Sequence, residues 1–373
     1  MNKIFYTFVL SALVLLSVQC NPKSQESDEQ LENDSIIEYA ELLSITCHDD
    51  YTDVKISNPW DSARLLHRYI LVPKTQNVPS NLPQGTVVRT PLSNTLVYAS
   101  VHCSLLEQLD ALSQIGGVCD LSYIKTPALL SRAENGKLTD AGNSMSPDIE
   151  RVMSLNPDAI LLSPFENAGY GRIGKMGIPI IECADYLETS PLGRAEWIKF
   201  FGLLYGKEVE ADSIFTEVEK NYTELRDKIG VLSVVISELK SGSAWYMPGG
   251  KSYMARFFKD AGAAYPWSDN TETGSIPLSF ETVFNRAGEA DIWLIKSFHV
   301  SELSYRTLQK EYAPYARFKA FREKKIYGCD SSRCNYYEET PFRPDLLLQE
   351  LAALFHPGLF PDYRFRYYQP LSE

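Results

Sequence analysis

One uninterrupted helical pattern constrains the fold more than any other part of the sequence. Residues 207–229 (KEVEADSIFTEVEKNYTELRDKI) place apolar side chains near helical spacing and contain neither Pro nor Gly. At the usual rise per residue this segment predicts a single helix about 30 Å long. Strands and helices alternate before it and again after it, so we expect the helix to join two α/β lobes.

The segment before the long helix, residues 91–206, is predicted to be the N-terminal α/β lobe. Residues 95–99 and 159–162 are short apolar runs that predict buried strands. A helix is predicted to begin at Ser146, with Ser146 as N-cap and Pro147 at the first helical position. This order of elements is typical of a parallel sheet.

The segment after the long helix, residues 230–373, predicts a second lobe of the same kind. Residues 231–239 predict a strand and residues 252–261 a helix. Residues 38–90 differ, because their short aromatic and β-branched runs predict strands without intervening helices. The predicted fold class is therefore α/β: two Rossmann-like lobes joined by a single long helix, with an N-terminal β-rich extension.

The N-terminus carries an export pattern. Residues 1–19 contain Lys3 followed by a short apolar stretch, which is typical of a signal peptide, and Cys20 ends that stretch as in a bacterial lipobox. Residues 20–37 are then a lipidated Cys and a polar, acidic tether. A plain secretory signal with an incidental Cys20 is the alternative. We expect a chain that is exported and held at the membrane, facing the periplasm, through its lipid alone.

Six of the seven cysteines remain once Cys20 is lipidated. An even number in an oxidising compartment favours disulfides. Cys329 and Cys334 are close enough in sequence to close a small loop, whereas the other pairings stay open. A metal site is the competing interpretation, but the sequence has no C-x-x-C and its five His are scattered. We therefore predict no metal site.

Composition and motifs exclude several classes of function. A formal charge of −12 argues against nucleic acid as a partner, because phosphate binding needs clustered cations. H-E-x-x-H and G-x-S-x-G are absent. Residues 249–252 (GGKS) imitate the end of a phosphate loop, but Trp245 stands where its first Gly belongs. The sequence therefore predicts a capped turn there, no catalytic residues and no enzyme.

Aromatic residues are dense in positions that follow predicted strands. The chain contains 22 Tyr, 17 Phe and 5 Trp. Ligands of open α/β sheets bind at the carboxyl ends of the strands. Aromatic faces supply rigid contact area for flat or apolar ligands, although each residue alone is as readily explained by core packing. As a set they favour a ligand cleft between the lobes.

Several phrases stand in a fixed order along the chain: DIERVMSLNPDAILLSP, GRIGKMGIPIIECAD and AEWIKFFGLLYGKEVEADSIFTEVEKNY, with GGKSYMARFFKDAGA and PLSFETVFNRAGEADIWLI further on. Together they resemble the periplasmic iron-siderophore, haem and cobalamin-binding proteins of ABC importers. The resemblance covers about residues 86–357 and leaves the β-rich extension unmatched. It implies two lobes on one rigid helix, which limits their closure.

The resemblance also implies contacts with a partner. The family places one Glu on each lobe, at the start of equivalent helices, to pair with Arg residues of the permease dimer. By position these are Glu150 and Glu281, and each begins a helix that leads into a buried strand. A favourable acid at a helix N-terminus explains either residue alone. Their matched placement favours docking.

The ligand loops of the family map onto ten residues of this chain. A haem or corrinoid would be held by aromatics, with His102 or His299 as a candidate axial ligand. An anionic ferric siderophore would favour Arg333 or Arg343. The implied ligand residues are Ser100, His102, Tyr123, Phe165, Trp245, Tyr246, Phe298, His299, Tyr336 and Tyr337.

The sequence thus predicts a substrate-binding lipoprotein that captures an iron chelate, haem or a corrinoid and delivers it to an ABC permease, with no cofactor of its own. Two alternatives stay open. One is a chelate-processing or chelatase-like enzyme on the same fold, which would need an acid/base or metal cluster in the cleft. The other is a surface lipoprotein that serves an outer-membrane receptor, which would need an exposed aromatic patch elsewhere.

Overall fold

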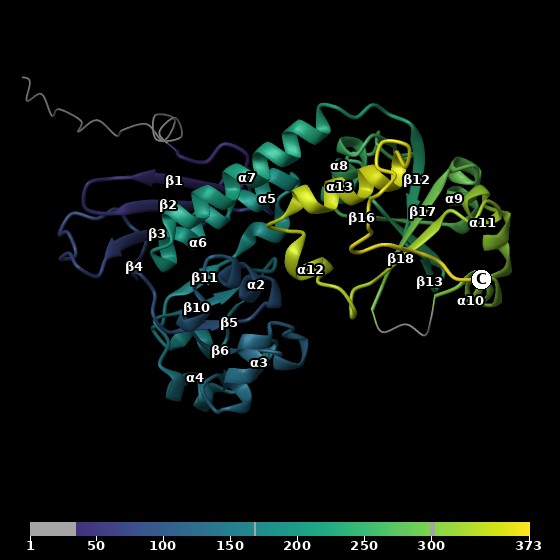
Figure 1. The fold of residues 1–373 in the computed structure, drawn as a ribbon. Helices are drawn as coiled ribbons and strands as arrows, with labels where there is room; N and C mark the ends of the chain where they lie inside the picture. The colour runs from purple at the N-terminus through teal and green to yellow at the C-terminus, as the bar shows by residue number, and fades with distance from the viewer. Residues whose placement is uncertain (1–34, 168, 299–302) are drawn as a thin grey trace, which may run out of the picture. The chain divides into compact units, whose positions relative to one another are not determined.

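The computed structural model describes residues 35–167, 169–298 and 303–373. Within them the chain forms an N-terminal four-stranded sheet and two α/β lobes, with helix α7 (Glu208–Arg226) between the lobes in sequence (Figure 1). The predicted fold class is confirmed. The predicted export signal, Cys20 and the tether up to Asp34 lie outside the described residues, as does His299.

The N-terminal extension is a small mixed sheet. Its order is β1-β2-β3-β4, antiparallel except for the parallel pair β3 and β4. Alternate residues such as Leu43 and Ile45, with Val54 and Ile56 opposite, are buried in the core, as period-2 side-chain alternation requires. The strands are β1 (Leu43–Cys47), β2 (Thr52–Ser57), β3 (Leu65–Pro73) and β4 (Thr86–Thr90).

Two buried carboxylates fix the chain just before this sheet. Glu196 is fully buried, and its carboxylate accepts hydrogen bonds from the backbone N–H groups of residues 38–40 at 2.7–3.0 Å. Glu188 accepts from those of residues 41 and 42, both at 3.0 Å. Lys199 pairs with Glu196 at 2.9 Å, so the charge is balanced. These bonds tie the root of the extension to α5 (Pro191–Glu196).

The N-terminal lobe is built on a fully parallel sheet of order β11-β10-β5-β6-β7. Its central strands are entirely buried, as expected where helices cover a parallel sheet. The lobe comprises β5 (Thr95–Val97), β6 (Ile115–Val118), β7 (Thr139–Asp140), β8 (Gly142–Asn143), β9 (Ser146–Pro147), β10 (Ala159–Leu162), β11 (Ile180–Glu182), α2 (Ser100–Gln108), α3 (Pro127–Glu134), α4 (Ile149–Leu155) and α6 (Ile198–Tyr205).

The predicted start of the helix at Ser146 is wrong by two residues. Ser146 and Pro147 form strand β9 with Gly142 and Asn143, and Asp148 is the N-cap of α4. The Asp148 carboxylate accepts from the N–H groups of Glu150 and Arg151 at 3.0 and 3.1 Å. Ser146 and Asp148 are both good caps, so local chemistry did not distinguish them.

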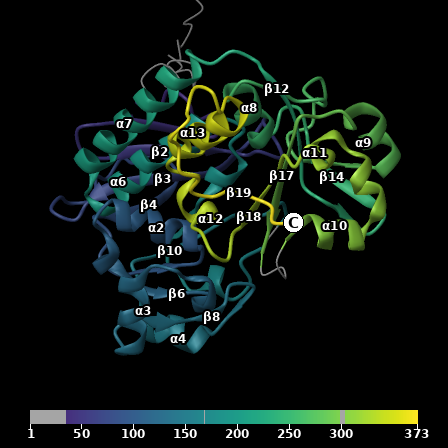
Figure 2. The same ribbon diagram turned by 45° about the vertical axis from the view of Figure 1, so that its right-hand side comes forward.

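Helix α7 packs against elements of both lobes. Its buried residues Ala211, Phe215, Val218 and Tyr222 recur at helical spacing along one stripe. The helix lies beside α6 of the N-terminal lobe and α13 (Pro344–Phe355) of the C-terminal lobe (Figure 2). The predicted long helix is present, and it is shorter than the predicted range at both ends.

The C-terminal lobe has a sheet of order β15-β12-β17-β18-β19, parallel except for its last strand. A small antiparallel sheet, β13-β14-β16, is formed by segments that lie between β12 and β17 in the chain. The elements are β12 (Ser233–Ser237), β13 (Lys240–Ser241), β14 (Ala244–Pro248), β15 (Ala263–Ala264), β16 (Ser275–Leu278), β17 (Ile292–Ser297), β18 (Ile326–Asp330), β19 (Gln369–Pro370), α8 (Tyr253–Asp260), α9 (Phe280–Ala287), α10 (Tyr305–Glu311), α11 (Lys319–Arg322) and α12 (Tyr336–Glu339).

The GGKS turn caps a helix, as predicted. The Ser252 hydroxyl accepts the backbone N–H of Ala255 at 3.2 Å and starts α8. No helix within the described ranges is both long enough and apolar enough to cross a membrane.

We predict that Glu196→Gln lowers the free energy of unfolding by about 3 kcal/mol, because charged hydrogen bonds to the residue 38–40 amides are lost and a donor NH₂ faces them. Urea denaturation checks this value. The matched control is Glu107→Gln, an exposed acid on α2, which should change stability by less than about 0.5 kcal/mol. Equal stability of Glu196→Gln and the native chain would contradict the anchoring role.

Candidate ligand-binding cleft

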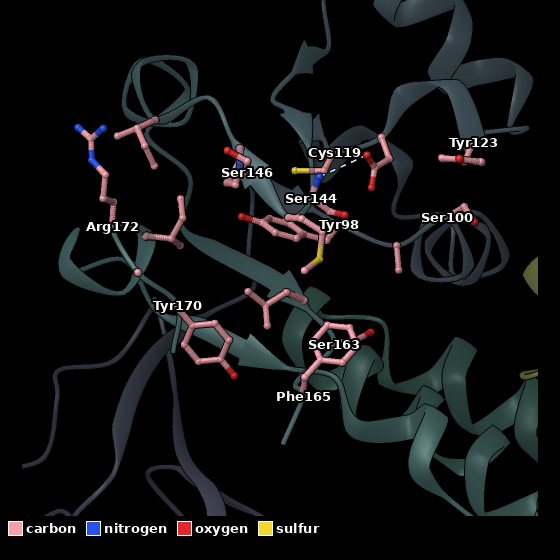
Figure 3. A pocket seen from close by; sticks show the side chains of 18 of the residues that line it. Tyr98, Ser100, Cys119, Tyr123, Ser144, Ser146, Ser163, Phe165, Tyr170 and Arg172 are labelled. Carbon is pink, nitrogen blue, oxygen red and sulfur yellow. Dashed lines mark hydrogen bonds between the residues drawn. The ribbon is translucent and has the colours of Figure 1, made fainter. Parts of the chain in front are cut away.

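A cavity of about 710 Å³ lies at the carboxyl ends of three strands of the N-terminal lobe. Tyr98 follows β5, Cys119 follows β6 and Ser163 follows β10, and all three line the cavity (Figure 3). Because the sheet is parallel, the strands end at the same edge and bring these residues together. The volume is in the range usual for small-molecule sites.

The inner wall of the cavity presents tyrosine hydroxyls that stay protonated. Burial raises the pKa of Tyr98, and the neighbouring Cys119 raises it further. Burial likewise raises the pKa of Tyr170, and the hydrogen bond that Tyr170 donates to the Glu182 carboxylate raises it further. The single proton of Tyr170 is donated to Glu182, so its oxygen offers a ligand an acceptor, and the serine hydroxyls of the lining offer the donors.

The β-rich extension supports this wall from behind. The other carboxylate oxygen of Glu182 lies 2.9 Å from His67 Nδ1, on β3. The Tyr69 hydroxyl accepts the Glu182 N–H at 2.8 Å and donates to the Ile180 carbonyl, also at 2.8 Å. The extension therefore holds β11 and, through Glu182, the orientation of Tyr170.

The rim of the cavity is aromatic and exposed. Tyr123, at the end of a short 3-10 turn, and Phe165, after β10, each keep more than half of their surface. Met145 is 80% exposed beside them. In Figure 3 Tyr123 lies at the upper right, near Ser100, and Phe165 lies lower, near Ser163. Large apolar surfaces that remain exposed around a cavity are typical of ligand sites.

The C-terminal lobe supplies a second aromatic set. Tyr246, Phe298 and Tyr337 are each about half exposed. The Phe298 and Tyr123 ring centroids are 6.1 Å apart, which brings residues of the two lobes into contact. Lys296, near the carboxyl end of β17, forms an ion pair with Glu238, which follows β12. Burial alone lowers the pKa of Lys296, but Glu238 and nearby tyrosines outweigh it and raise the pKa overall.

Most of the predicted ligand residues are exposed where a ligand can reach them. Tyr123 and Phe165 border the cavity, and Ser100 does so at the start of α2, where its hydroxyl also lies 3.4 Å from Glu338 of the other lobe. Tyr246, Phe298 and Tyr337 are surface residues of the C-terminal lobe.

Three predicted ligand residues are instead core residues. His102 is 1% exposed within α2, and its Nε2 lies 2.9 Å from the Asp185 carboxylate. Trp245 has no exposed surface and donates its indole N–H to the Ser237 carbonyl at 3.0 Å. Tyr336 is 3% exposed and packs on other tyrosines. Buried side chains with internal partners do not reach a ligand, so these assignments are corrected to packing roles.

The Asp185 carboxylate next to His102 is stabilised in its charged form. Burial alone raises the pKa of Asp185, but His102 and Arg194 outweigh it and lower the pKa. Its second oxygen lies 3.3 Å from the Arg194 guanidinium. This buried pair gives the Nε2 of His102 an internal partner, while its buried Nδ1 has none.

The residues named for an anionic siderophore lie elsewhere. Arg333 is largely exposed and pairs with Asp330 at 3.4 Å, and Arg343 pairs with Asp345 at 2.8 Å. Neither lines the cavity. In the described part of the chain, no three His, Cys, Asp or Glu side chains gather where they would hold a metal ion.

Sequence reasoning missed Tyr98, Cys119, Met145 and Tyr170 in the cavity. Tyr98 and Cys119 each come directly after an observed strand, β5 and β6, but the predicted strand 95–99 ran two residues too far and enclosed Tyr98. The predicted Cys329–Cys334 bond is not formed; both are free thiols with their sulfur atoms 3.7 Å apart.

The two proposed docking acids occupy matching positions. Glu150 lies in the first turn of α4 and Glu281 in the first turn of α9, and both side chains are exposed. Each helix has a side-chain N-cap, Asp148 in α4 and Ser279 in α9.

This fold and cleft define a solute-binding protein. The sequence model described as "Periplasmic binding protein" matches residues 104–332, and the chain belongs to that family.

The relatives fit that membership. An uncharacterized lipoprotein of Methanocaldococcus jannaschii is 28% identical over 356 residues, which cover 87% of this chain and 83% of the relative. The structure is similar in fold to the periplasmic heme-binding protein HutB of Vibrio cholerae (TM-score 0.57, 20% identity, covering 72% of this chain and 100% of HutB). It is also similar to the vitamin B12-binding protein BtuF of Vibrio cholerae (TM-score 0.52, 13% identity, covering 72% of this chain and 98% of BtuF).

Proposed function

We propose that this chain is the substrate-binding lipoprotein of an ABC importer and that it captures an iron chelate, haem or a corrinoid outside the membrane. The cavity at the strand ends of the N-terminal lobe carries this proposal. Its exposed rings face a space large enough for much of such a ligand, and its serine hydroxyls can donate to ligand oxygens.

The chemistry of the lining fits a metal that is already coordinated. Aromatic faces and hydroxyls contact the organic shell of a chelate, whereas a bare ion needs several anionic or imidazole ligands. HutB and BtuF, which share the fold, are named for binding heme and vitamin B12. The exposed rings of the C-terminal lobe would contact the opposite face of the ligand.

Delivery to the importer would use the two matched acids. Exposed carboxylates at Glu150 and Glu281, one on each lobe, can pair with cations on two equivalent permease subunits. The capped helix starts fix the backbone of both residues. The pairs would be broken and remade in each transport cycle.

The first prediction concerns the ligand. Titration calorimetry with cyanocobalamin, haemin and ferric hydroxamate or catecholate siderophores should find one probe that binds at one per chain with Kd below about 1 µM. Tyr123→Ala and Phe165→Ala should each weaken that binding at least tenfold, because each ring contributes about 1.5–3 kcal/mol when it is buried. Leu359→Ala, an exposed apolar residue outside the cavity lining, is the control. If none of the probes binds, the proposal is contradicted.

Docking is tested by charge removal. The double variant Glu150→Ala, Glu281→Ala should lose uptake of the bound probe into cells while keeping its affinity in calorimetry. The control pair is Glu107→Ala, Glu311→Ala, two exposed acids, one on each lobe, and it should transport normally. A collapse of ligand affinity in the first pair would show that the acids bind ligand instead.

Anchoring is tested at Cys20. The native chain should incorporate labelled palmitate and fractionate with membranes, and Cys20→Ser should do neither, because the thiol is the only group of the lipobox that accepts the lipid. Fractionation with washed membranes despite loss of the label would contradict a lipid-only anchor. A mature N-terminus other than residue 20 would support the plain secretory signal.

A further inference from the structure

A lysine of the N-terminal lobe holds a loop of the C-terminal lobe. Lys125 Nζ donates to the Ser331 carbonyl at 2.6 Å and to the Cys334 carbonyl at 2.9 Å, and lies 3.3 Å from the Glu338 carboxylate. These four residues are called the interlobe latch. Glu338 also lies 3.4 Å from the Ser100 hydroxyl, so it contacts the N-terminal lobe twice.

The latch lies next to the ligand-binding cleft on both lobes. Lys125 follows Tyr123 of the cavity rim by two residues. On the other lobe, the Ser331 N–H and hydroxyl both donate to the Ser297 carbonyl at 2.9 Å, and Ser297 precedes Phe298. A change in the latch therefore reaches the residues that bring the two lobes together.

Two cysteines flank the loop that the latch holds. Cys329 is buried in β18, where it lies opposite Lys296 of β17 in a parallel pair. Cys334 is partly buried and precedes α12. Their sulfur atoms are 3.7 Å apart, so they must approach by about 1.6 Å to form a bond. Because Cys329 is fixed in the sheet, Cys334 is the residue that moves.

The two thiols differ in reactivity. The Cys329 thiol lowers the pKa of Cys334 to about 7 by donating a hydrogen bond to it, and the Tyr336 N–H and Lys125 add to this effect against burial. The pKa of Cys329 is raised, first by the same bond and then by burial. A thiolate that is partly accessible attacks disulfides, and a buried partner then resolves the product.

We propose that Cys329 and Cys334 form a reversible disulfide whose formation releases the interlobe latch. The Cys334 thiolate attacks one sulfur of a low-molecular-weight disulfide, and the other sulfur leaves as a thiolate that takes up a proton. Cys329 then loses its proton to water and attacks Cys334 Sγ, which expels the second thiol. One disulfide is consumed and two thiols are released. The new bond draws Cys334 towards β18, and its carbonyl leaves Lys125.

The inference does not depend on the identity of the ligand. It requires only that the thiols pair and that the loop is held by Lys125. In the reduced protein the latch joins the two lobes beside the cleft. In the oxidised protein the lobes separate more readily there, which would let a bound ligand leave faster.

Hydrogen exchange with peptide mass mapping of the purified protein tests this inference. After equilibration with oxidised glutathione, the peptide that contains Cys329 and Cys334 should lose the mass of two hydrogens. Exchange over residues 121–126 and 331–339 should become at least threefold faster. Cys334→Ser should show neither change, whereas Cys47→Ser, which removes an exposed thiol elsewhere, should show both.

The Lys125→Ala variant removes the interlobe latch but leaves Cys329 and Cys334 able to form their disulfide. This variant should exchange fast over the same segments when reduced, and oxidation should add nothing. The proposal is overturned if the two thiols do not pair, if they pair without any change in exchange, or if Lys125→Ala still responds to oxidation.

Discussion

Helix α7 is the constraint on which the arrangement of the cleft depends. Its buried stripe packs against α6 of one lobe and α13 of the other, so a single hydrophobic core continues from lobe to lobe. Tyr222 adds a buried hydrogen bond to Asp260 of α8 at 2.9 Å. A packed helix does not bend easily, because its burial and its backbone bonds would both be lost. The two lobes therefore share one packed core, with the cavity at the strand ends of the N-terminal lobe and the Lys125 contacts joining the lobes beside it.

The extension adds a second constraint on the same cleft. Backbone amides of residues 38–42 are bound by the buried carboxylates Glu196 and Glu188, and His67 of β3 supports Glu182 behind the cavity. The extension thus helps to hold the cavity wall from outside the two lobes.

The sequence predicted the fold better than the site. Long patterns such as that of α7 and capping chemistry such as that of Ser252 depend on neighbouring residues, and both are present in the structure. Whether a side chain faces the core or a ligand depends instead on distant residues. The resemblance assigned His102 to the ligand. Its burial against Asp185 could not be foreseen, because the two residues are 83 positions apart. Trp245 was misassigned for the same reason, because its stacking partners come from later strands and helices.

Crystals grown with the chelate that binds most tightly offer the most direct test, through anomalous diffraction at the absorption edge of its metal. The account predicts one metal peak beside the cavity of the N-terminal lobe, with Tyr123 and Phe165 on one side of the chelate and Tyr246 or Tyr337 on the other. A peak elsewhere on the molecule would contradict the account. So would a metal that is coordinated by side chains of the protein in place of the donor atoms of the chelate.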